Sequence, residues 1–460
     1  MKNKKLLCVL LIIVFVIIIC FCILFIYDKI VWKEVNINLD PEYNELFTEE
    51  EMEIKGHENL LPEYISNVSV AYGNNDGTKT LYVFSSPIVF QDTSGAISFI
   101  DIRINNVENE EKRADGYLYT VANNDVIPFF PKELNSDSGI LIEKDISYQF
   151  GIESDNSVLG WYENRQNFIN ESKNMVVYKN FDNQGSDISV YPSNLGVNCE
   201  MNISQPLSEN IINFWLKLSD ENIHVEKEPG GYLVLTLYGN IVGVIQKPIL
   251  KDKTGNIYYD CKVDFVEEDD GIYSLKFDFG ESVTEDFVAY ISFEMRKEKQ
   301  PDNALYSNLP DLENAYLCNY SVIGNNFDYG LGRLLIRYEF TRFFRLKASQ
   351  IEKAEYYTYS LTNNTDQLEM LSMMEEWCSR TGNWNENYKT GLQTSLFELK
   401  DHELNFDITD EVKKWCEDPY GQLEYNGVML KSLNEEDDIF NVILSNDNAL
   451  YRNRTEIILK

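Results

Sequence analysis

The sequence has few of the residues, and none of the short motifs, on which common enzyme classes depend. Histidine occurs only at His57, His224 and His402, and none of them has the spacing of a zinc protease. A G-x-S-x-G elbow, a P-loop and a Rossmann glycine fingerprint are also absent. The usual signatures of metal-dependent hydrolysis, acyl transfer, phosphoryl transfer and dinucleotide chemistry are therefore missing, and the sequence favours a protein that is not an enzyme. A glycosidase is the enzymatic alternative, because its two carboxylates need no sequence motif.

Proline and glycine are sparse, with 12 and 24 residues in 460, which excludes collagen-like and low-complexity architectures. Beyond an apolar N-terminal stretch, cysteine occurs at five widely spaced positions: Cys199, Cys261, Cys318, Cys378 and Cys416. Five cysteines cannot all pair, and their spacing matches neither a dense disulfide scaffold nor a zinc site built on C-x-x-C pairs. Cys378 and Cys416 each follow a tryptophan, so we predict that these two form a disulfide, although spacing leaves the connectivity open.

Charged residues are wholly absent from residues 6–27, and about 20 apolar residues suffice to cross a bilayer as a helix. Three lysines precede this run and mixed charges follow it, so the positive-inside bias places residues 1–5 in the cytoplasm. A cleaved signal peptide is the alternative, but its apolar region is shorter and ends at a small-residue cleavage site, which this run lacks. The sequence predicts a single-pass protein of the cell membrane, in contact with the lipid bilayer through residues 6–27 and with an extracellular body.

Basic residues are outnumbered by acidic ones, 40 to 75, which gives a formal net charge of −35. Residues 1–33 contain five lysines and one aspartate, so the remainder of the chain carries −39. A surface that binds nucleic acid needs a basic face to displace counterions from the phosphates. Nucleic acid is therefore excluded as a partner.

Aromatic residues are plentiful, with 29 tyrosines and 25 phenylalanines, as is typical of half-buried strands. Short apolar or alternating runs recur along the chain, for example LYVFSSPIVF from residue 81, YLVLTLYGNIVGVI from residue 232 and IYSLKFDF from residue 272. Between them lie turn sequences such as Asn75-Asp76-Gly77, which suit tight reversals of antiparallel strands. The pattern predicts an all-β fold.

About 430 residues beyond the apolar stretch exceed the usual size of one core, so two domains are expected. Residues 28–60 are acidic with few large apolar side chains, and we interpret them as a stalk. Residues 296–303, RKEKQPDN, are charged and lack apolar periodicity, which indicates a linker. We predict a transmembrane helix followed by two antiparallel β-rich domains, an extracellular one at 61–295 and a second at 304–460.

Several segments of the second domain occur in a distinctive order: LLIRYEF at 334–340, Trp384-Asn385, FDITDEVKKW at 406–415, YNGVMLKS at 425–432 and RTEIIL at 454–459. This order resembles the DNRLRE domain, also described as carbohydrate-binding module family 96, which is found on extracellular bacterial proteins. The resemblance implies a jelly-roll-like β-sandwich with a carbohydrate-binding role.

The first domain contains SSPIVFQDTSGAISFIDIRI at 85–104 and KPILKDKTGN at 247–256. These segments resemble a region that precedes the DNRLRE domain in some wall-associated RHS-repeat proteins. No RHS repeats follow in this chain. The resemblance implies the display portion of such a protein, held at the bacterial cell surface by an N-terminal anchor.

Trp384, Tyr388 and Tyr356 are the candidate ligand-binding residues, because an aromatic face can stack on a sugar ring. The alternative is that they pack in the core, as most aromatic residues of a β-sandwich do. Trp377 and Trp415 match positions of the resembled family and are expected to pack between sheets.

Two acidic clusters, at 267–271 and 435–438, lie where hairpin loops are expected. A calcium site with oxygen ligands is one interpretation, but the spacing of an EF-hand is absent and a solvated loop is the simpler explanation. We predict no metal-binding residues and no cofactor, with calcium as the open alternative.

The preferred hypothesis is a membrane-anchored bacterial cell-surface protein with a carbohydrate-binding or structural β-sandwich module. Its partner would be a polysaccharide or cell-wall glycan. The alternative is a protein-protein interaction or display module without glycan binding, which exposed edge strands would support. A hydrolase that acts on glycans is the third hypothesis, and no catalytic residue is assigned for it.

Overall fold

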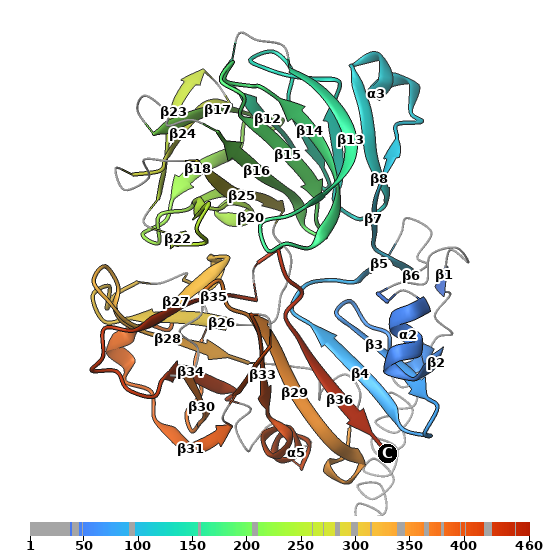
Figure 1. Cartoon of the computed structure of the whole chain (residues 1–460), viewed down its shortest axis with the longest axis vertical. Helices are drawn as coiled ribbons and strands as arrows, with labels where there is room; N and C mark the ends of the chain where they lie inside the picture. Colours follow the sequence, from blue (N-terminus) through green and yellow to red (C-terminus); the bar gives the residue numbers. More distant parts are fainter. Residues whose placement is uncertain are drawn as a thin grey trace, which may run out of the picture.

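The structure is a computed structural model, and the fold is drawn in Figure 1. The structure describes these residues: 37–38, 46–47, 49–91, 97–154, 158–204, 210–259, 261–269, 271–280, 286–295, 302–312, 315–337, 346–362, 368–378, 381–395, 397–400, 402–417, 426–446 and 448–460.

Strands dominate the described part of the chain, and the predicted all-β class is confirmed. Its α-helices are short: α2 (Glu49–Lys55), α3 (Glu110–Ala114) and α5 (Thr409–Glu417). None of the described helices has the length and apolar character needed to span a membrane. The predicted tail at 1–5 and the predicted transmembrane helix at 6–27 lie outside the described residues.

Two sheets form the upper part of the molecule in Figure 1, which we call the first sandwich. The larger sheet has the order β10 (Glu133–Leu134), β13 (Val158–Gln166), β14 (Ser172–Lys179), β15 (Asp187–Pro192), β16 (Gly196–Ile203), β25 (Phe287–Met295), β20 (Asn240–Ile245), β19 (Leu233–Leu237) and β18 (Ile223–Lys227), with β21 (Ile249–Asp252) joining β25 to β22 (Ile257–Tyr258). The facing sheet has the order β23 (Lys262–Asp269), β24 (Ile272–Asp278), β17 (Ile211–Leu218), β12 (Ser147–Ile152), β11 (Ile140–Glu143), β9 (Ile127–Pro131), β8 (Tyr117–Asn123) and β7 (Asp101–Asn106).

Two further sheets form the lower part, the second sandwich. One has the order β2 (His57–Leu60), β3 (Ser69–Asn74), β4 (Lys79–Phe84), β36 (Arg454–Leu459), β29 (Ile351–Tyr359), β33 (Glu403–Asp407) and β32 (Phe397–Lys400). The other has the order β31 (Thr390–Ser395), β30 (Leu368–Met373), β34 (Val428–Ser432), β28 (Gly330–Ile336), β27 (Tyr320–Asn326) and β35 (Phe440–Leu444), with β26 (Asp302–Tyr306) paired to β28. A small sheet of β1 (Ile37–Asn38), β6 (Ile97–Phe99) and β5 (Val89–Gln91) lies beside them.

Each sandwich encloses its own apolar core. In the first sandwich, Phe150 of one sheet stacks on Phe293 of the other, with ring centroids 3.7 Å apart. In the second, Leu81 and Val83 of β4 share a core with Ile336 and with Trp415 of α5. These contacts exclude water from the space between facing sheets, which is the main stabilising term in such folds.

The sheets do not follow the predicted domain ranges. Residues 79–84 pair along the whole of β36, so a segment placed by the prediction in the 61–295 domain is a strand of the second sandwich. Residues 49–60, placed in the predicted stalk, instead form α2 and β2, and Met52 packs over the outer face of β3 and β4. The predicted ranges were wrong because β4 is apolar on both faces. A strand of this kind contains no local sequence signal that identifies a pairing partner far along the chain. Of the predicted linker, residues 302–303 begin β26, and the rest lies outside the described residues.

The connection between β20 and β21 enters the second sandwich. Gln246 Nε2 donates a hydrogen bond to the carbonyl of Leu317 at 2.7 Å, and the amide of Asn319 donates to Gln246 Oε1 at 3.3 Å. Lys247 Nζ donates to the hydroxyl of Tyr329 at 2.6 Å and lies 5.3 Å from the centre of the Tyr320 ring. These side chains fix the position of one sandwich on the other.

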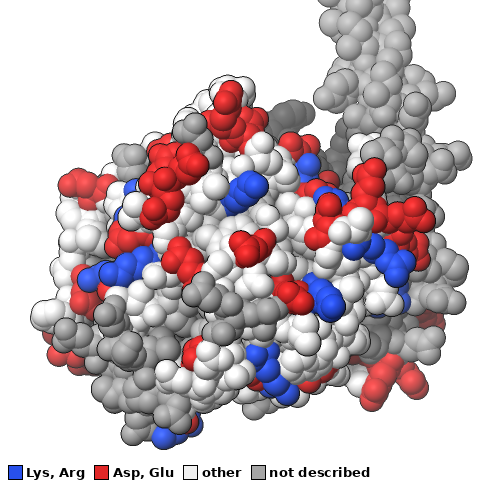
Figure 2. Space-filling view, turned by 90° about the horizontal axis from the view of Figure 1, so that it is seen from above, with Lys and Arg blue, Asp and Glu red and all other residues white. Residues whose placement is uncertain are grey.

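Seen from above, the face of the first sandwich carries scattered acidic side chains with basic ones among them (Figure 2). Within the first sandwich, Arg165 is held in ion pairs with Glu163 and with Asp187. The negative charge of the chain is thus spread over the surface rather than gathered in one patch on this face.

Candidate functional site

A cleft of about 550 Å³ lies where the two sandwiches and α2 meet. Both sandwiches contribute to its walls. The residues that line it are Leu46, Phe47, Glu51, Lys55, Phe84, Ser86, Ile102, Glu171, Lys173, Tyr191, Pro192, Ser193, Asn194, Leu195, Asn198, Glu403, Asn448, Ala449, Leu450, Tyr451, Arg452 and Arg454.

Arg454 of β36 organises the wall formed by the second sandwich. Its Nε donates to Glu456 Oε1 at 2.7 Å and its Nη1 donates to the hydroxyl of Tyr451 at 2.7 Å. The guanidinium lies 4.4 Å from the centre of the Tyr357 ring, and Glu403 Oε2 is 3.5 Å from Nη1. Burial opposes the charge of Arg454, but Tyr451 and the two carboxylates outweigh it and raise the pKa of this guanidinium. The side chain is therefore a fixed positive charge on this wall.

The wall formed by the first sandwich contains a buried carboxyl group behind the cleft surface. Glu200 of β16 is only 3% exposed and accepts hydrogen bonds from the Tyr191 hydroxyl at 2.6 Å and from the Phe168 amide at 2.8 Å. Burial raises the pKa of Glu200 to about 7, although these two hydrogen bonds oppose the shift. Glu200 therefore holds Tyr191 in place at the cleft wall.

Asn198 also lines the first-sandwich wall and has unused hydrogen-bonding capacity. Its Oδ1 accepts from the Tyr290 hydroxyl at 2.8 Å, but its Nδ2 has no hydrogen-bond partner among the residues that the structure describes. Asn198 is only 1% exposed, however, and this nitrogen has almost no accessible surface, so it lies beneath the cleft wall and out of reach of a ligand.

The charge of the cleft differs from that of the whole chain. Among the described residues that line it, three are acidic and four are basic: Glu51, Glu171, Glu403, Lys55, Lys173, Arg452 and Arg454. The whole chain has nearly twice as many acidic as basic residues. The cleft can thus accept neutral polar molecules and single negative charges without the repulsion expected elsewhere on the surface.

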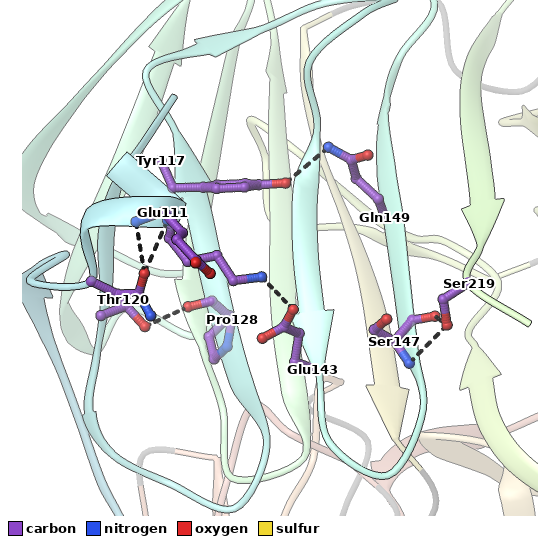
Figure 3. Close-up of polar contacts among 10 residues, drawn as sticks. Glu111, Tyr117, Thr120, Pro128, Glu143, Ser147, Gln149 and Ser219 are labelled. Atoms are coloured by element: carbon purple, nitrogen blue, oxygen red, sulfur yellow. Dashed lines mark hydrogen bonds and ion pairs between the residues drawn. The ribbon is translucent and has the colours of Figure 1, made fainter. Parts of the chain in front are cut away.

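A second hollow, of about 650 Å³, lies at the ends of β11, β12 and β17. Figure 3 shows that polar groups around it already bond to one another. Lys112 Nζ contacts Glu143, and the Ser219 hydroxyl donates to the carbonyl of Ser147 at 2.6 Å. These contacts tie neighbouring loops together, so we do not choose this hollow as the candidate site.

Tyr356, one of the three predicted ligand-binding residues, is not accessible to a ligand. It is 1% exposed and packs in the core of the second sandwich. Along β29 alternate side chains point to opposite faces, so Tyr356 points inward while Tyr357 and Tyr359 point outward. Tyr357, one position away, contacts Arg454 beside the cleft. The burial of Tyr356 therefore does not fit the ligand-binding role that was predicted for it.

Trp384 and Tyr388, the other two predicted residues, lie together on the outer face of the second sandwich, away from the cleft. Both are half-buried against a cluster of Leu305, Leu335, Met373, Trp377 and Met429. The Arg333 guanidinium lies 4.7 Å from the centre of the Trp384 ring and forms a double hydrogen bond with Glu435, at 2.7 and 2.8 Å. One face of Trp384 is thus already covered by Arg333.

Trp377 and Trp415 were both expected between sheets, and only Trp415 lies there. Trp377 packs on the outer face, where its indole N–H donates to the carbonyl of Asn426 at 2.6 Å. The predicted disulfide between Cys378 and Cys416 is not formed, because Cys416 is a free thiol. Cys416 follows Trp415 into the core, whereas Cys378 follows Trp377 on the outside. Burial raises the pKa of Cys416 to about 12.

The described residues of the two acidic loops are not arranged as metal ligands. Within the described residues, no group of three or more histidine, cysteine, aspartate or glutamate side chains could hold a metal ion. Several acidic side chains of the 435–438 loop have other partners: Glu435 bonds to Arg333, Asp437 to Asn434 and Asp438 to Asn325. Residue 270 of the other acidic cluster lies outside the described residues.

Comparison with known proteins does not identify the chain. No family model matches it, and no curated protein matches it. Among solved structures, the N-terminal domain of the Streptococcus gordonii adhesin Sgo0707 aligns over 87% of this chain and 91% of its own, with 8% identity and a TM-score of 0.16. A TM-score this low carries no argument about fold or function.

The raised pKa of Glu200 predicts a stability that falls as pH rises. Between the ordinary pKa of about 4.5 and the folded pKa of about 7, the unfolded chain loses this proton while the folded chain keeps it. Glu200→Gln removes the effect, so the free energy of unfolding of the variant should rise relative to wild type by about 2 kcal/mol from pH 5.5 to pH 8. Urea unfolding at both pH values measures the difference. A difference that does not change with pH would contradict the assignment.

Proposed function

We propose that this chain is a membrane-anchored bacterial cell-surface protein that binds a glycan in the cleft between its two sandwiches. The observation that carries the proposal is the cluster of Glu403, Tyr451 and Arg454 at the second-sandwich wall of the cleft, whose polar side chains are held in place and are only partly buried. A sugar hydroxyl would donate a hydrogen bond to the Glu403 carboxylate, and a bond to a charged group contributes more than one between neutral groups.

The remainder of the cleft suits the same class of ligand. Sugars present hydroxyl groups that donate and accept, together with apolar ring faces. The walls supply a carboxylate and a guanidinium, at Glu403 and Arg454, next to the aromatic ring of Tyr451. Directed polar groups beside an aromatic ring are the contacts by which a polar small ligand is oriented. We propose no catalytic step.

The resemblance of residues 304–460 to the DNRLRE domain supports the glycan proposal independently of the cleft. In this proposal the second sandwich corresponds to the jelly-roll-like module that the resemblance implies. Its sheet includes β4 from the N-terminal part of the chain, so a soluble fragment of residues 304–460 would lack one of the two neighbours of β36. Binding should therefore be measured on the full chain.

Glu403→Ala tests the site, because it removes the carboxylate from the cleft wall while Arg454 keeps its hydrogen bond to Glu456. The full-length chain in mild detergent is screened against purified peptidoglycan and an array of neutral and uronate-containing polysaccharides. For the glycan that binds, we expect Glu403→Ala to weaken affinity about tenfold, the value of one hydrogen bond to a charged group. Isothermal titration calorimetry measures the change.

Trp384→Ala is the matched control, because this residue belongs to the aromatic cluster outside the cleft. Its affinity should equal that of wild type. Loss of binding in Trp384→Ala with normal binding in Glu403→Ala would move the site to the outer cluster. If no glycan of the panel binds, a protein-binding or display module would replace the glycan proposal.

The membrane part of the proposal rests on the uncharged run at 6–27 and the lysines before it. Protease added to intact cells that express the chain with a C-terminal epitope tag should remove the tag, since the body would lie outside the cell. A cytoplasmic marker protein should survive the same treatment. Protection of the tag in intact cells would contradict the proposed orientation.

A further inference from the structure

The strand β13 has an open edge along most of its length. Its residues 160–166 pair with β14 on one side, while on the other side β10 pairs only with residues 158–159. No other described strand pairs with that side of β13. An open edge presents backbone groups in a row and can accept a further strand.

The direction of the free backbone groups follows from one hydrogen bond. The amide of Gly160 donates to the carbonyl of Lys132, at 2.8 Å, on the side away from β14. Successive residues of a strand direct their N–H and C=O groups to opposite sides, and the pairing with β14 has no register shift from 160 to 166. Tyr162, Asn164 and Gln166 therefore direct their backbone groups toward the open side.

The side chains along this edge leave room for a neighbouring strand. Tyr162, Asn164 and Gln166 are all exposed, and the stretch contains no proline or lysine of the kind that commonly blocks edge pairing. By contrast β23, another long edge strand of the first sandwich, carries acidic residues at 264, 267, 268 and 269, which would repel a second copy of itself.

The sequence of β13 is complementary to itself when two copies run antiparallel. With Asn164 opposite Asn164 of a second copy, Tyr162 lies opposite Gln166, and each of these facing pairs exchanges two backbone hydrogen bonds. The same register places Glu163 opposite Arg165 in both halves of the contact. Within one chain these two side chains already lie on one face of the strand, with Arg165 Nε 2.7 Å from Glu163 Oε1. The contact would therefore alternate negative and positive charges.

We infer that β13 is an interface for a second copy of this chain, which joins the two larger sheets across a twofold axis centred on Asn164. A twofold contact uses the same patch on both copies, so self-complementarity is the property it requires. Chains anchored in one membrane, as proposed above, meet by diffusion in two dimensions. Their high local concentration favours such pairing. The inference concerns a face of the first sandwich and does not depend on glycan binding in the cleft.

The backbone prediction is tested with Asn164→Pro, because proline removes an N–H that points to the open side and leaves the bonds to β14 intact. The full-length chain at about 10 µM in mild detergent is analysed by sedimentation velocity. We expect a dimer for wild type and for Asn164→Ala, which keeps the N–H, and a monomer for Asn164→Pro. Circular dichroism confirms that each variant is folded. A wild-type monomer, or a dimer in Asn164→Pro, would overturn the inference.

The register is tested by charge reversal. Glu163→Arg alone places four positive charges at the contact, and Arg165→Glu alone places four negative charges, so each variant should be monomeric. An equal mixture of the two variants should form heterodimers, since every facing pair is then of opposite sign. A misfolded variant could not produce this rescue. Failure of the mixture to dimerise, or dimers of either variant alone, would contradict the register centred on Asn164.

Discussion

The insertion of Gln246 and Lys247 from the first sandwich into the second is the contact on which the rest of the arrangement depends. Gln246 is fully buried and Lys247 is 5% exposed, so neither can return its polar groups to water without separating the sandwiches. Removing the partners of a buried charge typically costs about 3–5 kcal/mol. Around this contact, Ile249 and Tyr290 of the first sandwich share an apolar cluster with Tyr320 of the second. The junction therefore has a buried apolar cluster to which both sandwiches contribute.

A fixed junction gives the cleft its shape, because its walls belong to different sandwiches. Arg454 projects from the second sandwich, while Tyr191 and Asn198 belong to the first. A hinge at the junction would move these groups apart, and a single ligand would then no longer contact both walls of the cleft. The buried Glu200 adds to this rigidity, since it ties Tyr191 to the Phe168 loop that packs against the second sandwich.

Much of the local structure could be predicted from the sequence, whereas long-range contacts could not. Apolar runs and turn residues predicted an all-β chain because strand periodicity is a local property. The pairing of β4 with β36 joins residues almost 380 positions apart, and nothing in either strand names its partner. Along β29, a shift of one residue in register decides whether Tyr356 or Tyr357 faces outward. The sequence is apolar enough in both registers that it does not distinguish between them. The burial of Lys247 could not be predicted, because a lysine is ordinarily exposed. Only the distant Tyr320 and Tyr329 make its burial favourable.

Scanning calorimetry of the full chain tests most directly whether the two sandwiches form one unit. If the junction is as tight as its contacts indicate, both sandwiches should unfold in a single transition, with a calorimetric enthalpy equal to the van't Hoff enthalpy. Two separate transitions, each with the enthalpy expected of one sandwich, would show that the sandwiches unfold independently and would contradict the account.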